Sequence, residues 1–440
     1  MKIKSVKTLH CDAGWRPWTF VKILTDDGIV GWSECTDSHG SPRGIEGVVK
    51  DLEFLLLGED PADIDRLRWK VFSRTRQSVG GIVQKAIAGI ENALWDIKGK
   101  LYGVPVYKLL GGALRQSLPL YWSHCGTTRV RAHDTVKKPQ IKCMQDMIDF
   151  GAEIKLSGFK AIKTNIAVIG KDSHIYMPGF FKSAYGWPEL NADKKILRAI
   201  DIWVGAFRKV LGDDTGIILD LNFNFKTEGY IKIGRMLEKY DLLWLEIDSY
   251  DPEALRQIKD SVSMPICSGE NLYGARQYRP YFERHAMDSA SVDIIWNGFT
   301  ESRRIADMAE LYEMNVTPHN FNGHLSTFIS AQFAALTPNI RLMEIDVDDV
   351  PWRDELFMKV PLFTKDDKEM LLPEVFIDEA CSGRWRRRCS DRKKGFVREN
   401  FGRVGFYFYC CKTTGFFCRY PKIVSAYRIK CTDYSSTKRH

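Results

Sequence analysis

The feature that most constrains the fold of this chain is an alternation of short apolar runs with longer amphipathic segments from residue 118 onward. Segments 194–211 and 303–313, which lie between such runs, have the pattern of helices with one apolar face. Strands that alternate with helices form parallel sheets, and eight such units favour a closed barrel with helices outside it. A doubly wound sheet is the alternative, but no glycine-rich phosphate-binding turn follows an early strand. The apolar runs are 118–122, 161–164, 217–219, 242–245, 265–267, 292–295, 316–318 and 341–345.

The N-terminal part has a different order of elements, with predicted strands first and helices after them. Apolar residues from Val83 to Leu101 keep the helical period, and Gly103 and Pro105 end that helix. We therefore predict an α/β protein with an α+β capping domain at residues 1–115 and a modified TIM barrel of the (β/α)7β type at residues 116–373. The predicted strands of the cap are 2–9, 19–24 and 29–35, and its earlier helices are 47–57 and 62–74.

The remaining residues, 374–440, differ from both domains in composition. From Arg384 to His440 there are 16 Lys and Arg residues against 3 Asp and Glu residues, so this stretch accounts for the net charge of +8 and leaves the rest mildly acidic. Residues 374–440 contain six of the eleven cysteines and show neither helical nor strand periodicity. We therefore predict that they are an anomalous basic, Cys-rich tail that was translated after a frameshift. A nucleic-acid-binding arm and a Cys-rich metal module are the alternatives, although the cysteines lack Cys-x-x-Cys pairs.

The body of the chain has the features of a cytoplasmic protein. Its five cysteines show no paired spacing, which suits a reduced compartment. No apolar targeting segment follows Met1, and no apolar run approaches the roughly 18 residues that a membrane span needs. We therefore expect a cytoplasmic location, no membrane association and no nucleic acid as partner of the body. The five cysteines are Cys11, Cys35, Cys125, Cys143 and Cys267.

A charged residue or a histidine stands at or just after the end of most predicted barrel strands. From Asp220 onward these residues recur at intervals of 26, 24, 23, 26 and 25 residues, close to one strand–helix unit each. A barrel places the C-terminal ends of its strands on one face, so these side chains are expected to converge there. Acids on successive strands repel one another unless a cation neutralises them, and all-oxygen ligands favour Mg²⁺ or Mn²⁺ over zinc. The residues at the strand ends are Lys163, Asp220, Glu246, Glu270, Asp293, His319 and Glu344.

The motifs around these residues resemble the mandelate racemase subgroup of the enolase superfamily. In the barrel they include Asp220-Leu-Asn222, Ser268-Gly269-Glu270 and Pro318-His319; in the cap they include Gly31-Trp32-Ser33-Glu34 and the run from Ala88 to Lys100. The resemblance extends over both predicted domains. It implies a homo-oligomeric enzyme that binds Mg²⁺, with Mn²⁺ as a substitute, and acts on a small-molecule carboxylate.

The resemblance also implies roles for individual residues. Asp220, Glu246 and Glu270 are expected to bind the metal, and Asp293 and His319 to form the general acid/base pair. An enediolate formed next to a carboxylate is stabilised by a divalent cation, and His319 has a suitable ordinary pKa for removing the α-proton. Glu344 and Lys163 are further catalytic candidates. The expected substrate contacts are Trp15, His39, Asn165 and Asn222.

One departure from the family pattern bears on the reaction. Many members carry Lys-x-Lys at the second strand, whereas this chain has Lys163-Thr164-Asn165. A neutral amide cannot accept a proton, so racemisation with one base on each face of the substrate is disfavoured. We therefore predict an acid-sugar dehydratase that gives a 2-keto-3-deoxy acid, with a racemase or epimerase of an α-hydroxy acid as the alternative. A non-catalytic binding protein is a third, more distant hypothesis. The long segment 165–190 either lines the site or packs against the cap or a neighbouring subunit.

Overall fold

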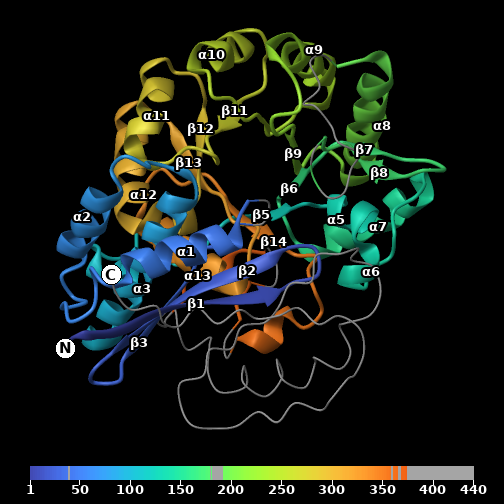
Figure 1. The fold of residues 1–440 in the computed structure, drawn as a ribbon. Helices are drawn as coiled ribbons and strands as arrows, with labels where there is room; N and C mark the ends of the chain where they lie inside the picture. Colours follow the sequence, from blue (N-terminus) through green and yellow to red (C-terminus); the bar gives the residue numbers. More distant parts are fainter. Residues whose placement is uncertain (38–39, 179, 181–191, 358–359, 365–367, 374–440) are drawn as a thin grey trace, which may run out of the picture.

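The computed structural model describes residues 1–37, 40–178, 180, 192–357, 360–364 and 368–373. Figure 1 shows a barrel of strands surrounded by helices, with the N-terminal sheet and helices packed against one side of it. The predicted substrate contact His39, most of the second half of segment 165–190 and the predicted tail 374–440 lie outside the described residues.

The N-terminal residues form a three-stranded antiparallel sheet followed by helices, as predicted. The strands pair in the order β1-β2-β3 and lie beside the long helix α3 (Figure 1). Their buried side chains share a core with those of α3. Helix α1 begins after Ser41, whose side chain accepts a hydrogen bond from the Gly44 amide, and α3 ends at Gly103, which adopts a left-handed conformation. The elements are β1 Ile3–Asp12, β2 Pro17–Thr25, β3 Val30–Glu34, α1 Pro42–Glu53, α2 Ile64–Thr75, α3 Gly81–Tyr102 and α4 Val106–Leu109.

Eight parallel strands form the barrel, and they lie side by side in chain order. The last strand, β14, pairs in parallel with the first, β5, and a single bridge between Val316 and Ile340 joins β13 to the residues just before β14. The ring is therefore nearly closed, which confirms the predicted barrel. Its strands are β5 Leu120–Ser123, β6 Ala161–Thr164, β9 Gly216–Asp220, β10 Trp244–Glu246, β11 Ile266–Ser268, β12 Ser289–Val292, β13 Asn315–Pro318 and β14 Met343–Asp346.

Helices between successive strands cover the outside of the barrel (Figure 1). In the described part of the chain β14 is followed by the 3-10 helix η2 Arg353–Leu356 in place of an α-helix, as expected for a (β/α)7β barrel. The covering helices are α7 Met144–Ser157, α8 Lys194–Leu211, α9 Thr227–Leu237, α10 Pro252–Asp260, α11 Gly274–Glu283, α12 Ile294–Leu311 and α13 His324–Leu336. Smaller elements are β4 Ser117–Leu118, which pairs with β15 Met370–Leu371, the hairpin of β7 Ala167–Val168 and β8 His174–Ile175, α5 Thr127–Arg131, α6 His133–Val136 and η1 Glu238–Tyr240.

One predicted strand is misplaced. The run 292–295 was expected to be the sixth barrel strand, but β12 is Ser289–Val292 and the following isoleucines begin α12. The buried side chains of β12 are small, Ser289, Ala290 and Ser291, so hydrophobicity does not mark this strand. Asp293 directly follows the strand and caps α12, because its carboxylate accepts a hydrogen bond from the Trp296 amide.

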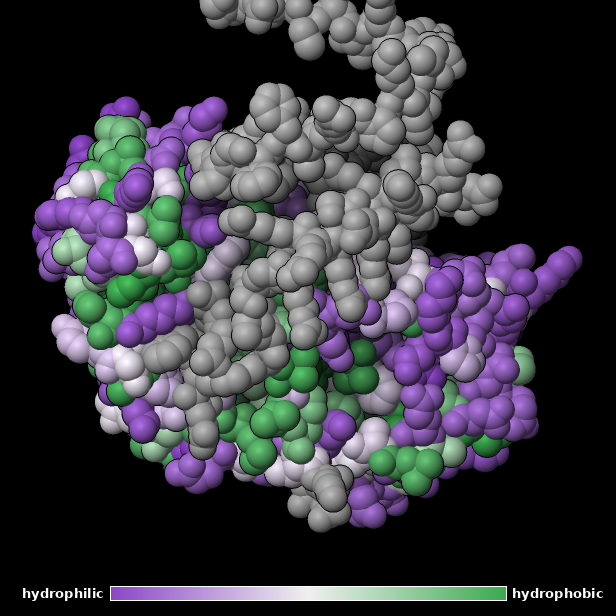
Figure 2. Space-filling model, turned by 90° about the horizontal axis from the view of Figure 1, so that it is seen from below, coloured by the Kyte–Doolittle hydropathy of each residue, from purple (hydrophilic) through white to green (hydrophobic). Residues whose placement is uncertain are grey.

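The surface of the described residues is mixed in polarity. In the view from below, hydrophilic residues gather on the right-hand side, and apolar residues are interspersed elsewhere (Figure 2). Among the described residues, no helix combines the length and the apolar character needed to cross a lipid bilayer.

The cap is joined to the barrel through buried polar groups of α3. Helix α12 is interrupted at Gly298, whose φ of 77° and ψ of 164° are accessible almost only to glycine. The second half of α12 begins there, and α3 caps it: Glu91 accepts a hydrogen bond from the Thr300 amide at 2.7 Å, and Asn92 accepts one from the Phe299 amide at 3.2 Å. The cap therefore satisfies backbone donors of the barrel that would otherwise be buried without partners.

We predict that Gly298→Ala destabilises the protein. A Cβ at this position would lie 2.6 Å from Glu91 Oε2, and the backbone conformation costs about 1–3 kcal/mol for a residue other than glycine. Gly47→Ala is the matched control, because Gly47 lies inside α1 with no atom within 4 Å of the added Cβ. Thermal unfolding should give a lower Tm for Gly298→Ala and an unchanged or higher Tm for Gly47→Ala. An equal Tm for both variants would contradict the interface described above.

Candidate active site

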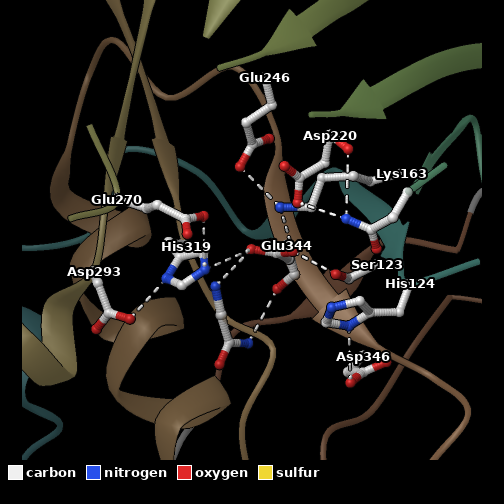
Figure 3. A network of polar contacts seen from close by, with 12 residues as sticks. Ser123, His124, Lys163, Asp220, Glu246, Glu270, Asp293, His319, Glu344 and Asp346 are labelled. Atoms are coloured by element: carbon white, nitrogen blue, oxygen red, sulfur yellow. Dashed lines mark hydrogen bonds and ion pairs between the residues drawn. The ribbon is translucent and has the colours of Figure 1, made fainter. Parts of the chain in front are cut away.

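The C-terminal ends of the central strands bring the predicted acids together. Asp220 and Glu246 end β9 and β10 and are paired neighbours in the sheet. Glu270 follows β11 after Gly269, whose φ of 110° turns the chain at a point where Tyr278 leaves no room for a side chain. Asp220 and Glu246 are at most 5% exposed, and the Glu270 side chain is 14% exposed. The predicted convergence of these three acids at one end of the barrel is thus present in the structure (Figure 3).

His319 and Asp293 form a hydrogen-bonded pair, as their positions on adjacent strands led us to expect. His319 Nδ1 lies 2.8 Å from Asp293 Oδ2, so the ring can donate through Nδ1 and present Nε2 to the site. Nε2 lies 3.2 Å from Glu270 Oε2. Burial alone would lower the pKa of His319, but Glu270, Asp293 and Glu344 together raise this pKa to about 9. The pair can therefore hold or move a proton at Nε2.

Lys163 lies between two carboxylates of neighbouring strands. Its Nζ is 2.9 Å from Glu246 Oε1 and 2.7 Å from Glu344 Oε1. Burial opposes the charge on this amine, yet Glu246 and Glu344 hold the pKa of Lys163 well above its ordinary value. Lys163 is therefore a fixed positive charge at the centre of the face, suited to contact an anion.

Glu344 is held by groups from three parts of the barrel (Figure 3). Ser123 at the end of β5 donates to Oε1, and the Asn320 amide donates to Oε2 at 2.9 Å. Burial would raise the pKa of Glu344, but Lys163 and His319 lower this pKa to about 2. Glu344 is thus ionised in this arrangement, and its predicted catalytic role stays a prediction.

The remaining acids carry more negative charge than their surroundings neutralise. Burial and the proximity of Glu246 raise the pKa of Asp220 to about 6. Burial and Asp248 hold the pKa of Glu270 well above its usual range, and burial with Asp220 does the same for Asp248. Asp248, two residues after Glu246, is a further buried acid at this site.

This donor set fits a divalent cation in its chemistry. Carboxylate oxygens on successive strands are the ligands that Mg²⁺ prefers, and a cation there would relieve the repulsion that raises these pKa values. As placed among the described residues, no three His, Cys, Asp or Glu side chains already form a common metal-binding group. Lys163 and His319 instead contact Glu246 and Glu270 in this arrangement, so metal binding requires these side chains to turn toward a shared ion.

The two asparagines near the acids are part of the same network. Asn165 is 2% exposed and donates through Nδ2 to Asp220 Oδ2 at 3.1 Å, while its Oδ1 accepts from Thr127. Asn222 has a left-handed backbone with a φ of 46°, and its amide donates to Asp220 Oδ1. Both asparagines therefore orient Asp220, and their predicted contacts with a substrate stay predictions.

Trp15, the cap residue predicted to contact the substrate, reaches the catalytic face of the barrel. Its ring packs edge-on against His124, with ring centroids 6.0 Å apart, and the neighbouring Arg16 forms an ion pair with Asp346 at the end of β14. The loop between β1 and β2 thus lies over strands β5 and β14. Trp15 remains a predicted substrate contact.

Sequence reasoning did not identify Ser123 and His124 as site residues. They directly follow the predicted run 118–122, so the strand-end rule that found Asp220 and Glu246 would also have found them had it been applied to the first strand. Asn320, whose amide nitrogens bind Glu344, lies next to His319 and gave no separate signal.

Comparison with known proteins agrees with this geometry. Residues 5–111 match the family described as "Mandelate racemase / muconate lactonizing enzyme, N-terminal domain", and residues 147–374 match "Enolase C-terminal domain-like". A D-xylonate dehydratase of Haloferax volcanii is 30% identical over 361 residues, which cover 81% of each chain. A D-galactonate dehydratase of Ralstonia nicotianae is 31% identical, over 69% of this chain and 71% of the relative.

Among solved structures, one similar protein is described as an L-alanine-DL-glutamate epimerase of Burkholderia xenovorans. It is 44% identical, has a TM-score of 0.81, and the match covers 84% of this chain and 92% of that one. That structure was determined with magnesium and fumarate bound. Relatives of this chain are thus described both as dehydratases and as an epimerase.

We predict that Mg²⁺ raises the Tm of the protein and that Asp220→Asn removes most of this shift. A ligand at 100 times its Kd stabilises the folded state by about 2.7 kcal/mol, and the variant loses one charged oxygen ligand. In the absence of metal, Asp220→Asn should be no less stable than the parent, because one repelling acid is gone.

The matched control for this experiment is Glu91→Gln, which changes a buried acid at the interface between cap and barrel. Its Tm without metal should fall, but its Mg²⁺-dependent shift should equal that of the parent. A full Mg²⁺ shift in Asp220→Asn would rule out Asp220 as a ligand.

Proposed function

Because the chain belongs to the mandelate racemase subgroup of the enolase superfamily, we propose that it is an acid-sugar dehydratase that removes the proton α to a carboxylate. The observation that carries this proposal is the His319–Asp293 pair, which faces the same end of the barrel as Asp220, Glu246 and Glu270. The dehydratase relatives named above support the same reaction class.

His319 is the proposed proton carrier. Asp293 holds Nδ1, so Nε2 takes the α-proton of the substrate and returns it to the hydroxyl that leaves from the β-carbon. The C–H and C–O bonds break, water leaves, and the enol that remains tautomerises to the 2-keto-3-deoxy acid. Lys163, which Glu246 and Glu344 position, orients the substrate carboxylate in this proposal.

Asp220, Glu246 and Glu270 would hold Mg²⁺. When bound, this cation supplies the positive charge that an enediolate next to a carboxylate needs. Asn165, which orients Asp220, has the supporting role in this arrangement.

An epimerase is the second candidate, and the 44% identical Burkholderia protein favours it. Epimerisation with two bases needs a proton acceptor on the face opposite His319. Lys163 is paired with Glu246 and Glu344 in this arrangement, and Asn165 is a neutral amide that cannot accept a proton. These two residues support dehydration over epimerisation.

The proposal predicts formation of a keto acid from a sugar acid. The purified chain is incubated with Mg²⁺ and a panel of aldonic and aldaric acids in deuterated water, and products are followed by NMR and by a 2-keto-3-deoxy acid assay. We expect at least one acid to yield keto acid. Exchange of the α-proton and formation of an epimer without keto acid would establish the epimerase instead.

His319→Asn should lower kcat by at least about 100-fold on the acid that turns over, because the amide cannot accept a proton. His285→Asn is the control for the same substitution: His285 is exposed and lies between α11 and β12 at the opposite end of the barrel. Its kcat should be unchanged. Full activity of His319→Asn would remove the His319–Asp293 pair from the mechanism.

A further inference from the structure

A second histidine–aspartate pair faces the same end of the barrel as His319 and Asp293. His124 follows the first barrel strand, and its Nδ1 lies 3.4 Å from Asp346 Oδ2 at the end of β14. In Figure 3 the two pairs lie on opposite sides of Glu344. The Asp346 side chain is fully buried, whereas the His124 side chain is 12% exposed, so the imidazole is the accessible member of the pair.

The backbone of His124 is unusual for its place in the fold. His124 has a φ of 49°, a left-handed conformation that is uncommon outside glycine. Most other such residues among the described ones follow helices, where this conformation commonly ends them: Lys137, Asp241, His285 and Glu313. His124 and Asn222 instead follow barrel strands on the catalytic face, and Asn222 binds Asp220. Uncommon backbone conformations concentrate at functional sites.

The surroundings of His124 come from the cap and from several elements of the barrel. The cap contributes Trp15 and Arg16, α5 contributes Arg131, β6 contributes Lys163, and β14 contributes Glu344 and Asp346. Burial and these cations, Arg131 first among them, hold the pKa of His124 well below its ordinary value. The imidazole is therefore neutral and has one donor and one acceptor nitrogen.

Phe321 links the two histidines. Its ring centroid lies 5.0 Å from that of His319 and 5.4 Å from that of His124. The two histidines therefore flank one ring, and a small molecule whose reacting carbon lies at His319 would have His124 as a neighbour. The neutral His124 imidazole has one donor and one acceptor nitrogen. It can therefore form complementary hydrogen bonds with a hydroxyl, which donates and accepts, better than with a carboxylate, which only accepts.

We propose that His124, which packs against Trp15 and lies beside Asp346, is a specificity-determining residue that binds the hydroxyl groups at the non-reacting end of a polyhydroxylated acid. This inference rests on the proposed function for the class of substrate, but it concerns binding and is independent of which reaction follows. His124 is a binding residue in this proposal, and His319 remains the proton carrier.

The test compares long and short acids on the same protein. In the His319→Asn background with saturating Mg²⁺, calorimetry measures binding of hexonic acids (gluconate, galactonate and mannonate), of galactarate and of glycerate, with and without His124→Asn. Glycerate has the same reacting end as the hexonic acids but lacks their distal hydroxyl groups. Asparagine tolerates the left-handed backbone and keeps polarity, but it is shorter than histidine.

We expect His124→Asn to weaken binding of the best hexonic acid about 5- to 10-fold and that of glycerate less than about twofold, the size expected for a lost hydrogen bond. Because both acids bind the same preparation, their ratio does not depend on how much of the variant is folded. His285→Asn, the control with the same left-handed backbone, should change neither affinity.

Three outcomes would overturn the inference. Equal weakening of hexonic acid and glycerate would mean that His124 only supports the fold. A loss confined to galactarate would assign His124 to a second carboxylate instead of a hydroxyl. Absence of binding of every acid would overturn both this inference and the proposed substrate class, whereas binding without formation of keto acid by the parent protein would overturn only the proposed reaction.

Discussion

The balance of charge at the C-terminal end of the barrel is the constraint on which the rest of this structure depends. Asp220, Glu246, Glu270 and Asp248 are brought together by the parallel strands, and burial makes each of their charges costly. Lys163 and His319 offset part of this charge by direct contact. Part of the negative charge remains uncompensated. This charge explains why these positions suit a divalent cation and why neutral donors such as Asn165 surround them.

The same burial explains why the cap is needed. The open end of a barrel would expose these groups to water, and the cap places over it the loop that carries Trp15, whose ring packs against His124. The attachment is polar and specific: Glu34 accepts hydrogen bonds from the Gly323 and Ser326 amides at the start of α13, just beyond His319, while Glu91 binds the Thr300 amide in α12. The cap thereby fixes the helices that follow the two strands bearing Asp293 and His319.

Much of this could be predicted from the sequence, because spacing and strand ends reveal the barrel and its acids. The strand β12 was misplaced because Ser289, Ala290 and Ser291 give no hydrophobic signal. His124 was missed because the strand-end rule was not applied to the first strand; its proposed role also depends on contacts with Trp15, Phe321 and Asp346, which are remote in the chain. The motif from Ala88 to Lys100 indicated the family correctly, but its polar residues Glu91 and Asn92 act at the interface with the barrel.

His319 and His124 each lie beside an aspartate, but their surroundings give the two imidazoles different pKa values. His319 has Glu270, Asp293 and Glu344 around it, and these anions raise its pKa to about 9. His124 has Arg131, Lys163 and Arg16 around it, and burial with these cations holds its pKa well below the ordinary value. A proton is therefore stabilised on the His319 side of Glu344 and excluded from the His124 side. This asymmetry favours chemistry with one proton carrier at His319 and hydrogen bonding by a neutral ring at His124.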